Sequence, residues 1–134
     1  INDRVRRSRV MTESFMNILR HPKAVGKTLR KMHHLHFLNA FIPEFKNIFC
    51  KVQFDLYHIY TVDIHTLFAV EEMCKLWDGE YAESYPLLTD VANNIEKREL
   101  MLLSILFHDI GKGSGKDHSS QGASMIRLMR GAWV

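Results

Sequence analysis

The chain has 134 residues, of which 46% are hydrophobic and 25% charged, with a formal net charge of +3. This length supports one hydrophobic core, and the composition is normal for a soluble globular fold, so we expect a single domain spanning residues 1–134. A charge of +3 is too small to indicate nucleic-acid binding by itself. Four arginines near the N-terminus fit a solvated helix face better than an RNA site: Arg4, Arg6, Arg7 and Arg9.

Membrane and secretion signals are not visible in the sequence. No apolar run reaches the length of a membrane span, and no signal peptide is recognisable. Cys50 and Cys74 lack the CxxC spacing, which favours reduced thiols and a cytoplasmic location. Because the sequence begins with Ile1 rather than Met, we expect a piece of a longer protein. We also expect its helical bundle to be truncated at the C-terminal side.

The spacing of apolar residues predicts an all-α fold. We expect a leading amphipathic helix over residues 3–20 that includes Val10 in its apolar stripe, then helical stripes after Pro22 and after the N-cap candidate Thr61. The second of these should end near Asp78 and Gly79. Further expected elements are a core segment over 35–42, short helices over 43–49 and within 79–96, a helix over 97–110, and a last helix within 117–134.

The helix over 97–110 carries the first functional signal. It is apolar almost all round, which predicts a buried central helix, yet it ends in His108 and Asp109. Burial and the negative end of the helix both oppose the charge of that aspartate. A divalent cation would relieve both penalties, and His with Asp suits such an ion. A purely structural His-Asp pair is the alternative.

A glycine-rich turn follows, with Lys112 and Lys116 among its glycines. The glycines let the backbone turn sharply, and two lysines beside them suit a phosphate, although helix-ending glycine is equally ordinary. Three histidines upstream, His33, His34 and His36, are poor candidates for one ion because adjacent helical residues point to different faces. His65, early in the helix after Thr61, would by itself be read as structural.

Taken together, His65 and the LFHDIGKG motif resemble the HD superfamily of metal-dependent phosphohydrolases, which are all-helical. Within it, the segments YTVD-x-HTL and KG-x-G-x-DHS-x-x-GA are similar to the HD domain of bifunctional PII uridylyltransferase/uridylyl-removing enzymes. This resemblance covers about residues 15–123. It implies hydrolysis of the phosphodiester between UMP and a tyrosine of the PII nitrogen-signalling protein, with glutamine sensing and nucleotidyl transfer carried out by other domains.

The resemblance also implies roles for individual residues. His65, His108 and Asp109 match the ligands of a divalent metal, Mn²⁺ or Mg²⁺, with iron as an alternative. His118 matches a histidine that serves a second ion in two-metal members. Asp109 would also accept a proton or bridge two ions, and Lys112, with Lys116 as the weaker candidate, would face the substrate phosphate.

Two departures from the family pattern are visible. Ile64 stands where the residue before the first ligand is usually acidic, and no Asp or Glu follows Asp117, so the closing carboxylate is missing. We therefore expect this chain to bind metal weakly and to turn over slowly or not at all. Two other functions stay open: an HD phosphohydrolase acting on a free alarmone, cyclic dinucleotide or dNTP, and a non-catalytic helical regulatory module.

Overall fold

The computed structural model describes residues 1–52 and 59–114, and this part of the chain is helical without strands. The all-α prediction is confirmed. The elements in chain order are α1 (Asp3–Arg6), α2 (Arg9–Arg20), α3 (Val25–His34), α4 (Phe37–Phe41), the 3₁₀ helix η1 (Pro43–Asn47), α5 (Val62–Trp77), α6 (Pro86–Asn93), α7 (Arg98–Phe107) and the 3₁₀ helix η2 (Ile110–Ser114). Within these two ranges, no helix is both long and apolar enough to cross a membrane.

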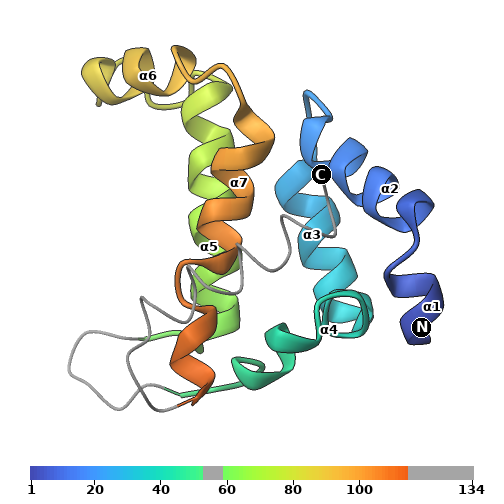
Figure 1. Ribbon diagram of the computed structural model, residues 1–134. Coiled ribbons are helices and arrows are strands. Elements are labelled where there is room, and N and C mark those ends of the chain that lie inside the picture. The colour runs from blue at the N-terminus through green and yellow to red at the C-terminus, as the bar shows by residue number, and fades with distance from the viewer. Residues whose placement is uncertain (53–58, 115–134) are drawn as a thin grey trace.

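Helix α5 is the centre of the fold, because it contacts α3, α6 and α7 (Figure 1). The two helices α5 and α7 lie side by side and run in opposite directions. The first turn of α5 and the last turn of α7 therefore lie at the same end of the bundle. That arrangement brings together two stretches of chain that are more than 40 residues apart in sequence.

Local sequence sets the bounds of α5. Thr61 is its N-cap residue, with an extended backbone, and Asp63 is the acidic residue in the first turn. At the other end, Asp78 caps the helix and Gly79 adopts a φ of +77°, which glycine tolerates without steric cost. The predicted start and end of this helix are both confirmed.

The core is a single apolar cluster between α2, α3, α4, η1, α5, α7 and η2, and Ala92 of α6 also belongs to it. Its fully buried members come from all of these elements except α6 and include Phe15, Leu29, Leu38, Phe45, Leu67, Val70, Leu102, Leu106 and Ile110. Because both 3₁₀ helices contribute to the cluster and contact each other, the turn after α7 is fixed against the body of the protein. This turn carries Lys112.

The leading helix differs from the prediction of one helix over residues 3–20. The Ser8 hydroxyl donates to the carbonyl of Val5 at 2.7 Å and accepts from the amide of Met11 at 3.3 Å. Serine competes with the backbone in this way, so it ends α1 and caps α2. Val10 consequently faces solvent with 72% of its surface exposed, and Leu35, expected in the core, is 65% exposed.

The prediction that the helix over 97–110 is buried all round is also wrong. Only one face of α7 is buried, through Leu102, Leu106 and Phe107. Leu100 is 47% exposed and Ser104 is exposed as well. Hydrophobic composition predicted the helix correctly, but which faces are covered depends on the neighbouring elements, and the described neighbours cover one side.

Candidate metal and phosphate site

The candidate site begins with His65, in the first turns of α5. Its amide donates to the carbonyl of Thr61 at 2.8 Å, which places it one turn after the N-cap. Its Nε2 atom lies 4.0 Å from Oδ2 of Asp109, and its ring lies edge-on to the ring of His108 with centroids 5.8 Å apart. The antiparallel packing of α5 and α7 thus brings the upstream histidine to the His-Asp pair.

His108 caps the C-terminus of α7, and its ring is oriented by the helix itself. Nδ1 lies 2.6 Å from the carbonyl oxygen of Ile105. Because a carbonyl can only accept, the proton must be on Nδ1, so Nε2 of the neutral ring carries a lone pair. That nitrogen lies 3.2 Å from Oδ2 of Asp109. A lone pair facing a carboxylate oxygen is unfavourable unless a positive charge lies between or beside them.

Asp109 lies between the end of α7 and the start of η2. Its side chain is 12% exposed, whereas those of His65 and His108 are 42% and 41% exposed. We expected the side chains at the end of α7 to be buried. This is confirmed for the carboxylate of Asp109, whereas the imidazole of His108 and the nearby imidazole of His65 are partly exposed. The ammonium group of Lys112 donates to Oδ2 of Asp109 at 2.8 Å and partly neutralises its charge.

These side chains fit a divalent cation. One ligand atom from each of His65, His108 and Asp109 lies within 4.8 Å of the others, and the three come from two separate segments. Two imidazole nitrogens and one carboxylate oxygen form a donor set used by Mn, Fe and Zn. The Ile105 carbonyl supplies the second-sphere hydrogen bond that metal-bound histidines usually make. The structure brings these three residues together, and their binding of a metal stays a prediction.

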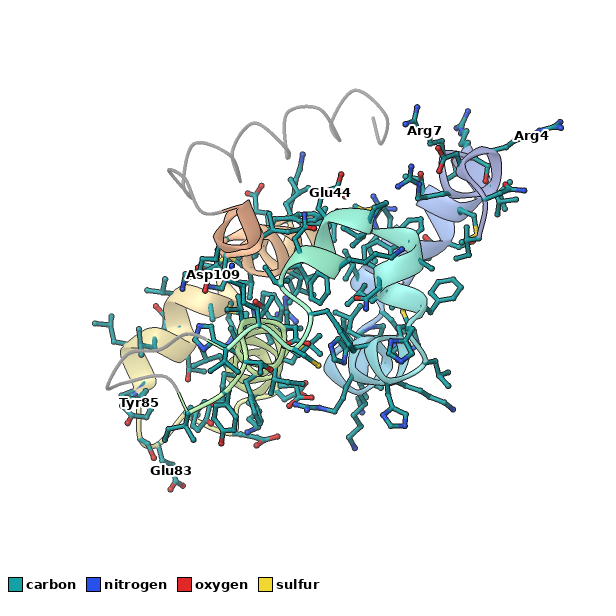
Figure 2. All side chains as sticks on the ribbon, turned by 90° about the horizontal axis from the view of Figure 1, so that it is seen from below. Arg4, Arg7, Glu44, Glu83, Tyr85 and Asp109 are labelled. Atoms are coloured by element: carbon teal, nitrogen blue, oxygen red, sulfur yellow. The ribbon has the colours of Figure 1, made fainter. Side chains whose placement is uncertain are left out.

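Figure 2 shows Asp109 at the junction of α5, α7 and the last described turn. Of the predicted phosphate ligands, Lys112 lies at this junction, in η2. Lys116 and His118 lie outside the described residues, so their predicted roles are untested. His33, His34 and His36 do not belong to the group of candidate ligands among the described residues, and His33 bonds to Asp63 instead.

Sequence reasoning missed one buried hydrogen bond, between a histidine and an aspartate, that supports the site. Nε2 of His33 lies 2.8 Å from Oδ2 of Asp63, and the amide of Cys50 donates to the same oxygen at 3.0 Å. Burial opposes the charge of Asp63, but hydrogen bonds from Thr61, Cys50 and His33 outweigh burial and hold its pKa below the ordinary value. Because Asp63 lies two residues before His65, this pair fixes the first turn of α5 against α3.

Comparison with known proteins identifies related sequences. A family model described as the uridylyltransferase GlnD third domain matches residues 1–41. The chain is 40% identical over 111 residues to an enzyme of Vibrio atlanticus, 41% over 124 residues to one of Azotobacter vinelandii, and 38% over 127 residues to one of Bordetella pertussis. Each is named bifunctional uridylyltransferase/uridylyl-removing enzyme.

These alignments cover 83%, 92% and 95% of this chain but only 13%, 14% and 15% of the three relatives. No solved structure matches significantly. The likeness extends over most of the described helices, including those that carry His65, His108 and Asp109. The chain is therefore homologous to one segment of the bifunctional uridylyltransferase/uridylyl-removing enzymes.

Proposed function

We propose that this chain carries a metal-dependent phosphodiesterase site of the HD type, which removes UMP from a uridylylated tyrosine of a PII-type signalling protein. The observation that supports it best is the convergence of His65, His108 and Asp109 within 4.8 Å, from two antiparallel helices. The names of the relatives supply the reaction, since they include removal of a uridylyl group. The motif LFHDIGKG links that reaction to these residues.

In the proposed reaction, a bound divalent cation would act as a Lewis acid toward a phosphoryl oxygen and would lower the pKa of water. The side chains of this protein would hold the cation and accept a proton. His108 presents Nε2 because Ile105 holds its other nitrogen, and Asp109 supplies negative charge and a proton acceptor. Water adds to phosphorus, the bond from phosphorus to the tyrosine oxygen breaks, and that oxygen takes up a proton, so the products are UMP and tyrosine.

Lys112 would bind the phosphate. Its ammonium group already lies 2.8 Å from Oδ2 of Asp109, with the side chain 23% exposed. A swing away from Asp109 would allow the same group to offset the charge that develops on the phosphoryl oxygens. The PII-type partner, and control by glutamine through other parts of a longer protein, belong to this proposal as well.

The same contact also favours a second function, in which the His-Asp pair is structural. Lys112 satisfies Asp109 without any ion, as expected for a non-catalytic helical module. The two functions differ in one measurable property, the dependence of metal binding on Asp109. Removing one of three ligands should weaken a real site strongly, whereas a structural pair has no metal affinity to lose.

Calorimetric titration with Mn²⁺ of the wild type and of Asp109→Ala tests the proposal. We expect weak binding by the wild type, at least tenfold weaker binding by the variant, and slow metal-dependent release of UMP from uridylylated PII. The matched control is Asp90→Ala, which removes an exposed carboxylate from α6. Equal Mn²⁺ affinity in wild type and Asp109→Ala, or no binding by either, would leave the structural module as the better description.

A further inference from the structure

An aromatic cluster beside the candidate site has no role in the proposed hydrolysis as described so far. Tyr60 directly precedes the N-cap of α5, and its ring lies 4.7 Å from that of Phe68. The guanidinium group of Arg30 lies over the ring of Phe68, 4.7 Å from the ring centroid. Both nitrogens of Arg30 that face α5 are bonded to Glu71, at 2.6 and 2.7 Å. Successive contacts thus run from Glu71 through Arg30 and Phe68 to Tyr60.

The outer end of this cluster faces solvent. Tyr60 is 51% exposed and its neighbour Ile59 is 90% exposed, while Phe68 is partly buried. Neighbouring exposed apolar side chains form a patch, and such patches mark ligand or partner sites more often than single exposed side chains do. The bidentate pair of Arg30 and Glu71 fixes the base of the cluster, so a planar molecule would meet a preorganised ring and not a mobile one.

The cluster lies next to the donor set along α5. Phe68 follows His65 by three residues, so the two side chains are neighbours on the same side of the helix, with about 5–6 Å between Cβ atoms. A ribose separates the base of a nucleotide from its phosphate by a comparable span. A uridylyl phosphate held at His65, Asp109 and Lys112 would therefore place its base within reach of Tyr60.

We infer that Tyr60, supported by Phe68, is the platform on which the nucleobase of the substrate stacks. Stacking on an aromatic ring binds any base through its π face and needs no hydrogen-bonding partner. The inference rests on the proposed function, because it takes the substrate to be a nucleotide. It adds the residues that recognise the base, whereas the donor set and Lys112 recognise only the phosphate.

Titrations of the chain with UMP and with ribose 5-phosphate, both in Mg²⁺, test this platform. We expect the wild type to bind UMP more tightly than ribose 5-phosphate, because only UMP carries a base. Tyr60→Ala should bind UMP roughly tenfold more weakly. The same variant should keep its affinity for ribose 5-phosphate, and Tyr60→Phe, which retains the ring, should bind UMP within about twofold of the wild type.

The matched control is Tyr85→Ala. Tyr85 is 55% exposed and also lies against a second ring, that of Tyr81 at 6.0 Å, but it precedes α6 at the far end of α5 (Figures 1 and 2). Its loss should change neither affinity. A third ligand, O-phosphotyrosine, represents the other half of the substrate, and its affinity should not depend on Tyr60.

Four results would overturn the platform: equal affinity of the wild type for UMP and ribose 5-phosphate, unchanged UMP binding by Tyr60→Ala, equal losses for both ligands, or a loss confined to phosphotyrosine. Failure of the platform is distinguishable from failure of the hydrolase. If Mn²⁺ binding depends on Asp109 while UMP binding does not depend on Tyr60, the proposed hydrolase site is supported and the stacking platform is rejected. If Mn²⁺ does not bind while UMP binding still requires the ring of Tyr60, the stacking platform is supported and the metal-dependent hydrolase site is rejected.

Discussion

The ammonium group of Lys112 lies 2.8 Å from Oδ2 of Asp109, the same oxygen that faces Nε2 of His108 at 3.2 Å. A divalent ion bound by the histidines would need that oxygen too, so lysine and ion compete for it. Lys112→Met should therefore raise Mn²⁺ affinity, by about three- to tenfold for the loss of one nearby charge. The same change should weaken binding of UMP, because the phosphate loses its cation. Calorimetry with each ligand measures the two opposite effects.

Lys75→Met is the control for that variant. Lys75 also pairs with a carboxylate three residues earlier on its helix, Glu72 at 2.7 Å, but it lies toward the other end of α5. Neither affinity should change in this control. Weaker Mn²⁺ binding by Lys112→Met would mean that the lysine supports the position of Asp109 instead of competing with the ion.

Sequence reasoning located the longer helices well because their apolar residues recur at helical spacing. The stripe of Leu67 and Val70 predicted α5 with its cap at Thr61, and the structure buries both residues. It also anticipated that His65 reaches Asp109, since a motif resemblance carries information about tertiary structure that periodicity does not. The sequence could not predict which side of α7 is buried, because the exposure of Leu100 depends on which other elements pack against that side.

The contacts that support the candidate site could not be predicted from the sequence either. Asp63 lies 30 residues from His33 in sequence, and nothing in either local pattern indicates that they meet. The hydrogen bond from His108 to the Ile105 carbonyl depends on a rotamer, which a sequence does not specify. Charged and aromatic side chains on a helix have several possible partners, and the packing of α3 against α5 selects among them.

The buried pair of Asp63 and His33 leads to a prediction about stability. Asp63→Asn should lower the free energy of unfolding at pH 7 by roughly 1–3 kcal/mol, because the neutral amide lacks the negative charge that strengthens the hydrogen bonds from His33 and from the amide of Cys50 to Oδ2. The exposed Asp90→Asn change on α6 is the control and should cost less than about 0.5 kcal/mol. Urea unfolding followed by circular dichroism measures both.

The pH dependence of Asp63→Asn has a definite sign. The pKa of Asp63 is lower in the folded protein than its ordinary value, so its contribution is fully present above the ordinary pKa. That contribution is lost as the pH falls through the lower, folded pKa. The stability difference between wild type and variant should therefore be constant near neutrality and shrink below about pH 4. A difference that grows in acid would contradict this assignment.

Gly26 allows the close approach of α3 to α5. A Cβ atom placed there would lie 2.6 Å from Cγ of Glu71, a side chain that Arg30 holds in place. Alanine would gain up to about 1 kcal/mol of helix propensity, but the overlap should outweigh it, giving a net loss of about 1–2 kcal/mol. The pair Gly26→Ala and Glu71→Ala should be strongly non-additive, because removing Cγ removes the overlap. Additive losses in a denaturation cycle would show that the close approach is not what glycine provides.

The one-sided burial of α7 can be tested with two identical substitutions on one helix. Leu106 is fully buried in the core, whereas Leu100 is 47% exposed. Leu106→Ala should cost about 2–5 kcal/mol through lost burial and the cavity left behind, and Leu100→Ala should cost less than about 1 kcal/mol because little surface leaves water there. Both changes carry the same small gain in helix propensity, so their difference in urea unfolding reports packing alone. Similar losses at both positions would mean that the Leu100 face of α7 is covered in solution.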